Sequence, residues 1–173
     1  MPEHEALVIR EAAPGDCAAV AAMVAELAAF EKAAERCQAT PEAVRAALFE
    51  RREARALVAI APGSAEPVAM AVYFFNFSTW RSRKGLYLED LYVRPAARGQ
   101  GVGTAMMRRL AAIAVAQGCA RFDWSVLAWN APAIAFYEKR LGAEVLPDWR
   151  ICRLEGEGLA ALAAASDQTR ETL

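Results

Sequence analysis

The stretch "VRPAARGQGVGTAMMRRL", Val93–Leu110, places glycines at 99, 101 and 103 directly before an apolar pattern of helical period. A helix start presents unpaired N–H groups and the positive end of the helix dipole, and glycines let a phosphate approach the backbone closely. The stretch therefore predicts a helix that binds a phosphate-bearing ligand at its start. A tight turn without a ligand is the alternative for this loop taken alone.

Two familiar phosphate loops do not fit this stretch. The P-loop requires a Lys-Ser/Thr pair after its last glycine, whereas Val102, Gly103 and Thr104 follow Gly101. The dinucleotide fingerprint requires a further glycine where Thr104 stands. A different class of phosphate-bearing ligand is therefore indicated.

Composition limits the partners of the chain. Its 173 residues fit a single domain over 1–173, with a polar tail from about Ser166. A formal net charge of -1 argues against nucleic acid as a partner. The start "MPEHEALVIREAAP" has no basic leader or long apolar run, and no apolar run reaches the roughly 20 residues that span a bilayer. We therefore expect a cytoplasmic protein without a membrane partner.

The cysteines and the single histidine exclude two kinds of chemistry. Cys17, Cys37, Cys119 and Cys152 are far apart in the sequence, and His4 lies near the terminus. No pair has the spacing of a metal site, so we expect no bound metal. Because His4 is the only histidine, a catalytic triad that contains histidine is also excluded.

Strand and helix patterns alternate along the chain. Apolar, β-favouring runs cover 6–11, 54–61, 67–77, 85–93, 121–128 and 149–155, and helical patterns cover 14–31, 39–52, 99–118 and 130–142. Asp16 and Thr40 stand at cap positions, with Pro41 in the first turn after Thr40, and Gly142 closes the last helical pattern. The runs 54–61 and 67–77 form a natural hairpin. This order predicts one α/β domain with mixed strand pairing.

Three ordered motifs carry a family resemblance. They are "GLYLEDLYV" at 85–93, "RGQGVG" at 98–103 and "WNAPAIAFYEKRLGA" at 129–143. Together they resemble the GNAT superfamily of N-acetyltransferases, and within it the spermidine/spermine (diamine) group. The resemblance implies a mostly antiparallel central sheet with one splayed, bulged strand and flanking helices. It also implies acetyl-CoA as co-substrate and a homodimer with active sites near the subunit interface.

The resemblance assigns the coenzyme-binding residues. They are the bulged-strand backbone at Leu91, Tyr92 and Val93; the loop Arg98, Gly99, Gln100, Gly101, Val102, Gly103 and Thr104; and Asn130, Lys139 and Arg140 near the last motif. The freed strand N–H groups would also stabilise the thioester oxygen. Asn130 is in addition a candidate helix cap. Solvated surface charge is the alternative for Lys139 and Arg140.

Acetyl transfer to an amine requires that the amine lose its proton first. An alkyl amine with a pKa of roughly 10.4 is almost wholly protonated at neutral pH, so a nearby carboxylate is needed to accept that proton. Glu89 is the first candidate base, by resemblance and because it interrupts an apolar strand. Alternation sends Glu89 and Asp90 to opposite faces unless a bulge intervenes. A structural ion pair with arginines is the alternative for both.

The leaving thiolate in turn requires a proton. Tyr137 occupies the position that carries this role in the family, and a phenol with a pKa of about 10 can donate it. The alternative places Phe136 and Tyr137 together in an aromatic core. Cys119 has no histidine to activate it as a nucleophile, so direct attack by the amine in a ternary complex is favoured over an acetyl-enzyme.

Acidic residues indicate a cationic acceptor. By resemblance the acceptor-binding residues are Phe30, Glu31, Glu89, Asp90, Asp123, Trp124, Ser125 and Asp148. The expected acceptor is a small cationic primary amine, such as a diamine, a polyamine or a lysine-like amine. Ala128 stands where polyamine enzymes often carry glutamate, which weakens the expectation of spermine or spermidine and leaves shorter diamines, lysine-like amines such as thialysine or a small aminated metabolite. Acetylation of a protein lysine or N-terminus is one alternative function, and acyl-CoA sensing without turnover is another.

Overall fold

The computed structural model describes residues 6–165, so His4 and the polar tail from Ser166 lie outside the described residues. The chain divides into two compact units, 1–133 and 134–173, and each is considered by itself. The first contains β1 (Val8–Glu11), α1 (Cys17–Phe30), α2 (Pro41–Arg45), β2 (Arg55–Ile60), β3 (Pro67–Ser78), β4 (Arg83–Val93), α3 (Val102–Ala116) and β5 (Phe122–Trp124).

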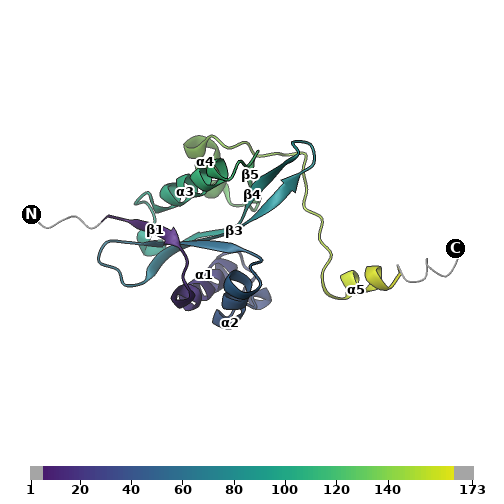
Figure 1. Ribbon diagram of the computed structural model, residues 1–173, viewed down its shortest axis with the longest axis horizontal. Coiled ribbons are helices and arrows are strands. Elements are labelled where there is room, and N and C mark those ends of the chain that lie inside the picture. Colours follow the sequence, from purple (N-terminus) through teal and green to yellow (C-terminus); the bar gives the residue numbers. More distant parts are fainter. Residues whose placement is uncertain (1–5, 166–173) are drawn as a thin grey trace, which may run out of the picture. The chain divides into compact units, whose positions relative to one another are not determined.

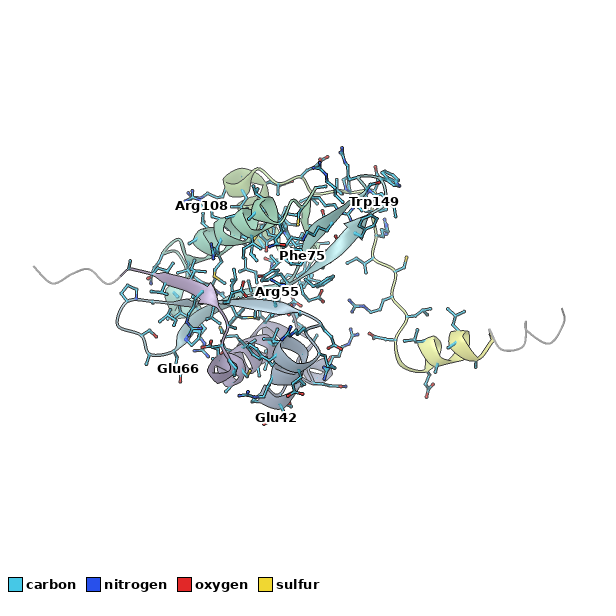
Figure 2. The ribbon with its side chains drawn as sticks, viewed as in Figure 1. Glu42, Arg55, Glu66, Phe75, Arg108 and Trp149 are labelled. Atoms are coloured by element: carbon cyan, nitrogen blue, oxygen red, sulfur yellow. The ribbon has the colours of Figure 1, made fainter. Side chains whose placement is uncertain are left out.

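The five strands form one sheet in the order β1-β2-β3-β4-β5 (Figure 1). The first four strands are paired antiparallel, and β5 is parallel to β4. The sequence predicted this mixed, mostly antiparallel sheet and the β2–β3 hairpin, and both are confirmed. Arg55 of β2 lies over the ring of Phe75 of β3, with 5.4 Å between guanidinium and centroid (Figure 2).

Helices cover the two faces of the sheet. Figure 1 shows α1 and α2 on one face and α3 on the other. On the α1 side, Val20 and Met23 pack against Met70 of β3, and all three are buried. On α3, Met106 and Leu110 are fully buried. This packing places the start of α3 next to the end of β4, from which the glycine-rich loop emerges.

Helix starts agree with the sequence at one site and differ at another. Thr40 caps α2 as predicted, because its hydroxyl accepts a hydrogen bond from the Ala43 N–H at 3.1 Å. Asp16 precedes α1, but its carboxylate accepts hydrogen bonds from Arg10 and from the Ala13 N–H at 2.7 Å instead. The buried charge is thereby paired with a cation, and Arg10 holds the pKa of the Asp16 carboxyl below its usual range.

Two predicted strands at the C-terminal side need correction. The run 121–128 is a strand only at Phe122–Trp124, because β5 pairs with β4 over just those three residues. The run 149–155 forms no strand in the described chain. A strand requires a neighbour for its backbone N–H and C=O groups, and periodicity does not supply that neighbour.

The second unit consists of helical segments and an extended connection. Helix α4 (Ala131–Leu141) begins just before the unit boundary, and α5 is Gly156–Ala165. Gly142 ends α4 with φ of 70° and an N–H donated to the Glu138 carbonyl at 3.2 Å, as predicted. Large apolar side chains are exposed along the connection, among them Trp149 and Ile151. Within residues 6–165, no helix is both long and apolar enough to cross a membrane.

Candidate active site

A β-bulge interrupts the long β3–β4 ladder. Tyr73 of β3 pairs with Leu88 and the preceding Val72 pairs with Asp90, which leaves Glu89 as the extra residue. The predicted bulge is therefore confirmed, and it lies at the predicted base. Because Val72 packs on the α1 side of the sheet, its partner Asp90 faces α1 as well, and Glu89 is exposed. The bulge reverses the alternation of side chains at this point of β4.

The sheet splits directly after the bulge. Pairing between β5 and β4 ends at Leu88, so no strand of the described chain pairs with this edge beyond Leu88. The Arg94 N–H donates to Val68 of the β3 side at 2.9 Å, and alternation then turns the N–H and C=O of Leu91 and Val93 away from β3. The edge thus presents the N–H groups of Leu91 and Val93 and the C=O of Leu91 to a ligand, whereas the Val93 C=O accepts a hydrogen bond from Arg98. The backbone of Tyr92 faces β3.

The glycine-rich loop continues from this edge into α3. Gly99 and Gly101 have φ of 76° and 82°, in the left-handed region that favours glycine. Gly101 is the N-cap of α3 and makes no side-chain cap, so the first N–H groups of the helix are left for another partner. A Cβ added at Gly99 or Gly101 would meet no protein atom within 4 Å. This open helix start fits a diphosphate group.

Three carboxylates gather where the bulge faces the end of α1. Burial, followed by the negative charges of Glu89 and Glu31, raises the pKa of Asp90 to about 6. Burial also raises the pKa of Glu31, which follows the last residue of α1. Because the charges of Glu89 and Glu31 both act on Asp90, these two side chains lie close enough to Asp90 to interact with it electrostatically. Such a cluster favours a cation.

The raised pKa of Asp90 predicts a pH dependence of stability. The folded chain binds more protons than the unfolded chain between about pH 4 and pH 6, so the free energy of unfolding falls as pH rises through this window. Over this pH range the free energy of unfolding of Asp90→Asn should fall by about 2 to 3 kcal/mol less than that of the wild type. Urea unfolding from pH 4 to pH 7 measures it, with Glu35→Gln as an exposed control. Parallel curves for wild type and Asp90→Asn would contradict the assignment.

Phe30 and Glu31, at the end of α1, form one wall of the candidate site, called here the Phe30–Glu31 wall. The Ala33 N–H donates to Ala28 at 2.9 Å and the Lys32 N–H to Ala29 at 3.1 Å, which is the Schellman pattern. Lys32 takes the left-handed position with φ of 61°, where glycine is usual, so this turn is strained. The strained turn fixes the direction in which Phe30 and Glu31 leave the helix.

Trp129 joins this wall, although the sequence analysis did not assign it. Its ring lies 5.9 Å from the ring of Phe30, and the Lys32 ammonium is 5.5 Å from its centroid. In the sequence, the only sign that Trp129 belongs to the site is the place of this aromatic residue directly before the predicted cap Asn130. Asn130 does cap α4, since its side-chain oxygen accepts a hydrogen bond from the Ala133 N–H at 3.3 Å.

The predicted acceptor residues of β5 already have protein partners. Asp123 forms an ion pair with Arg121 at 2.8 Å, and the hydroxyl groups of Ser125 and Tyr87 are 2.8 Å apart. The ring of Trp124 packs 4.9 Å from the ring of Phe122. Tyr87 was not assigned from the sequence, although alternation along β4 places it on the face that Asp123 shares. The side chains of Tyr87, Asp123 and Ser125 therefore form a polar surface at β5.

The remaining predicted residues lie in or near the second unit. Tyr137 is partly buried and its ring lies 5.4 Å from that of Phe136. Lys139, Arg140 and Asp148 are exposed. In the loop of the first unit, Gln100 donates from its side chain to the Ala96 carbonyl at 3.0 Å. The roles of these residues therefore stay predictions.

No group of His, Cys, Asp and Glu side chains in the described residues is arranged to hold a metal ion. Cys119 is partly buried in the turn after α3, far along the chain from the bulge. What the structure brings together is a split sheet, a bulge with carboxylates and an open helix start. These features define an α/β enzyme that can hold a phosphate-bearing ligand against an exposed strand edge.

Comparison with known proteins identifies the family. Residues 21–143 match the Acetyltransferase (GNAT) family. The chain is 41% identical over 167 residues to a thialysine N-epsilon-acetyltransferase of Sus scrofa, covering 91% of this chain and 97% of that protein. It is 31% identical over 163 residues to the spermidine/spermine N(1)-acetyltransferase-like protein 1 of Homo sapiens, covering 90% of this chain and 23% of that protein.

A solved structure agrees with this result. The integron cassette protein from the mobile metagenome of V. cholerae superposes with a TM-score of 0.76 at 26% identity, covering 92% of this chain and 98% of that one. The protein described here belongs to the GNAT acetyltransferase family and is an N-acetyltransferase.

Proposed function

We propose that the protein transfers the acetyl group of acetyl-CoA to a primary amine of a small cationic acceptor. The observation that carries the proposal is the cluster of Glu31, Glu89 and Asp90 at the open edge of β4, next to the uncapped start of α3. GNAT acetyltransferases use acetyl-CoA as co-substrate. The open edge and the glycine loop offer the backbone groups that such a co-substrate requires.

The residues of the cluster have different roles toward the acceptor. Glu89 is exposed at the bulge, where it accepts the amine proton directly or through water. Asp90 and Glu31 attract the cation to this point by their charge. The N–H groups of Leu91 and Val93 stabilise the oxygen of the thioester as negative charge develops on it. Tyr137, assigned by resemblance, returns a proton to the leaving thiolate.

Among cationic acceptors, a lysine-like amine is the first choice. The relative at 41% identity over nearly its whole length is named for thialysine. Ala128 also removes a carboxylate that a long polyamine would use, as the resemblance implies. We therefore rank thialysine and similar side-chain amines above spermidine and spermine, and propose a homodimer as the working form.

The test is a thiol-release assay with acetyl-CoA against thialysine, lysine, ornithine, putrescine, spermidine, spermine and a lysine peptide. We expect thialysine to give the highest kcat/KM, at least about tenfold above spermine. Spermine would bring an ammonium group that has no carboxylate partner where Ala128 stands, and one such unpaired group costs about that much in binding. The variant Cys119→Ala should retain full activity if the amine attacks directly. Turnover of the peptide alone would replace the proposal with protein acetylation, and binding of acetyl-CoA without turnover would replace it with sensing.

A further inference from the structure

The side chain of Arg98 contacts two parts of the candidate site, which are Phe30 at the end of α1 and the open edge of β4. Its guanidinium carbon lies 5.7 Å from the ring centroid of Phe30 and 5.6 Å from that of Tyr92. Its Nε donates a hydrogen bond to the Val93 carbonyl at 2.8 Å. Phe30 ends α1, whereas Val93 ends β4 and faces the open edge. The guanidinium therefore connects two elements that no local sequence pattern brings together.

This arrangement depends on the shape of the guanidinium group. A planar guanidinium stacks its faces on aromatic rings while its N–H groups donate in the plane. Here the guanidinium lies within cation–π distance of the rings of Phe30 and Tyr92, and its Nε–H donates to the Val93 carbonyl. The ammonium of a lysine could supply the charge but not both contacts, so charge and position can be separated by substitution.

The end of α1 is an element that needs such an anchor. Helix ends fray, and this one closes through a strained turn at Lys32. Phe30 is 43% exposed, so its packing, which includes the ring of Trp129 at 5.9 Å, buries only part of the residue. The contact with Arg98 ties this end to the strand that carries the bulge.

We propose that Arg98 is a positioning residue that holds the Phe30–Glu31 wall at a fixed place against the β4 edge, and so sets the affinity for the acceptor. The inference rests on the proposed function, since it assigns Phe30 and Glu31 to the acceptor. It differs from a role as a phosphate ligand, which would act on acetyl-CoA. Arg98 also begins the glycine loop, so the same side chain connects that loop to Phe30.

Kinetics separate the two roles. For Arg98→Lys and Arg98→Met we expect the KM of the amine to rise about tenfold at saturating acetyl-CoA, the loss that follows from removing the contacts of the guanidinium with the two rings and its hydrogen bond to Val93. The Kd of coenzyme A, from titration calorimetry, should change less than about threefold. Phe30→Leu, from the other side of the contact, should raise the amine KM without adding to the effect of Arg98→Met. A normal amine KM in Arg98→Lys, or an effect confined to the Kd of coenzyme A, would overturn the proposal.

Hydrogen exchange tests the positioning without any substrate. The amides of Glu31, Lys32 and Ala33 are bonded to the last carbonyls of α1 at 2.9, 3.1 and 2.9 Å. In Arg98→Met these amides should exchange about tenfold faster, because the end of the helix is released. The amides of Gln117 and Gly118 at the end of α3 are the matched control and should not change. Equal exchange at the end of α1 in Arg98→Met and wild type would overturn the inference, even if no tested amine is acetylated.

Discussion

Tyr137→Phe should lower kcat about 100-fold and leave the Kd of acetyl-CoA within about twofold of wild type. The substitution removes only the phenol hydroxyl, and a positioned proton donor contributes about 10²–10⁴ to the rate. The ring and its packing 5.4 Å from Phe136 are preserved, so a purely structural role predicts little change in kcat. Steady-state kinetics at saturating amine, together with titration calorimetry, measure both quantities.

The control for this variant is Tyr73→Phe. Tyr73 is fully buried and its hydroxyl donates to the Glu11 carboxylate at 2.8 Å, and its side chain lies on the face of the sheet opposite to that of Asp90. It should lose stability by about 1.5–3 kcal/mol, the usual value of a hydrogen bond to a charged group, without a change in kcat. A rate for Tyr137→Phe within about twofold of wild type would remove Tyr137 from the mechanism and restore the aromatic core as its role.

Local sequence patterns predicted most of the sheet and its helices. The hairpin of β2 and β3, the Thr40 cap and the glycine stop at Gly142 all depend on neighbouring residues, and each was found. The missing strand at 149–155 depends on a partner, which a periodic pattern cannot specify. The second part of the helix at 39–52 also differs, because Ala46–Glu50 winds as a π-helix.

The candidate site, like the fold, could be predicted from the sequence only in part. Glycine chemistry indicated the open start of α3, but alternation alone places Glu89 and Asp90 on opposite faces of the sheet. Only the family resemblance indicated the bulge that the pairing of β3 with β4 contains. The contact of Arg98 with the ring of Phe30 joins residues far apart in the sequence, so nothing in either segment could reveal it.

Gly101→Ala should raise the KM of acetyl-CoA by about tenfold or more. The added methyl group would meet no protein atom within 4 Å, so it enters open space at the N-cap of α3, where we propose that the diphosphate binds. A charge-assisted hydrogen bond from a helix start to a phosphate is worth about 1.5–3 kcal/mol, and loss of one accounts for this change. The KM of the amine at saturating acetyl-CoA should stay within about twofold.

Backbone strain is the competing explanation, and Gly63→Ala isolates it. Gly63 lies in the β2–β3 turn with φ of 70°, close to the 82° of Gly101, and a Cβ there also meets no atom within 4 Å. Both variants should therefore lose about 1–2 kcal/mol of stability, which thermal unfolding measures. Since only Gly101 begins α3, only Gly101→Ala should affect acetyl-CoA. If the two variants raise the KM of acetyl-CoA equally, strain explains the effect, and the glycine-rich loop is a turn rather than a phosphate site.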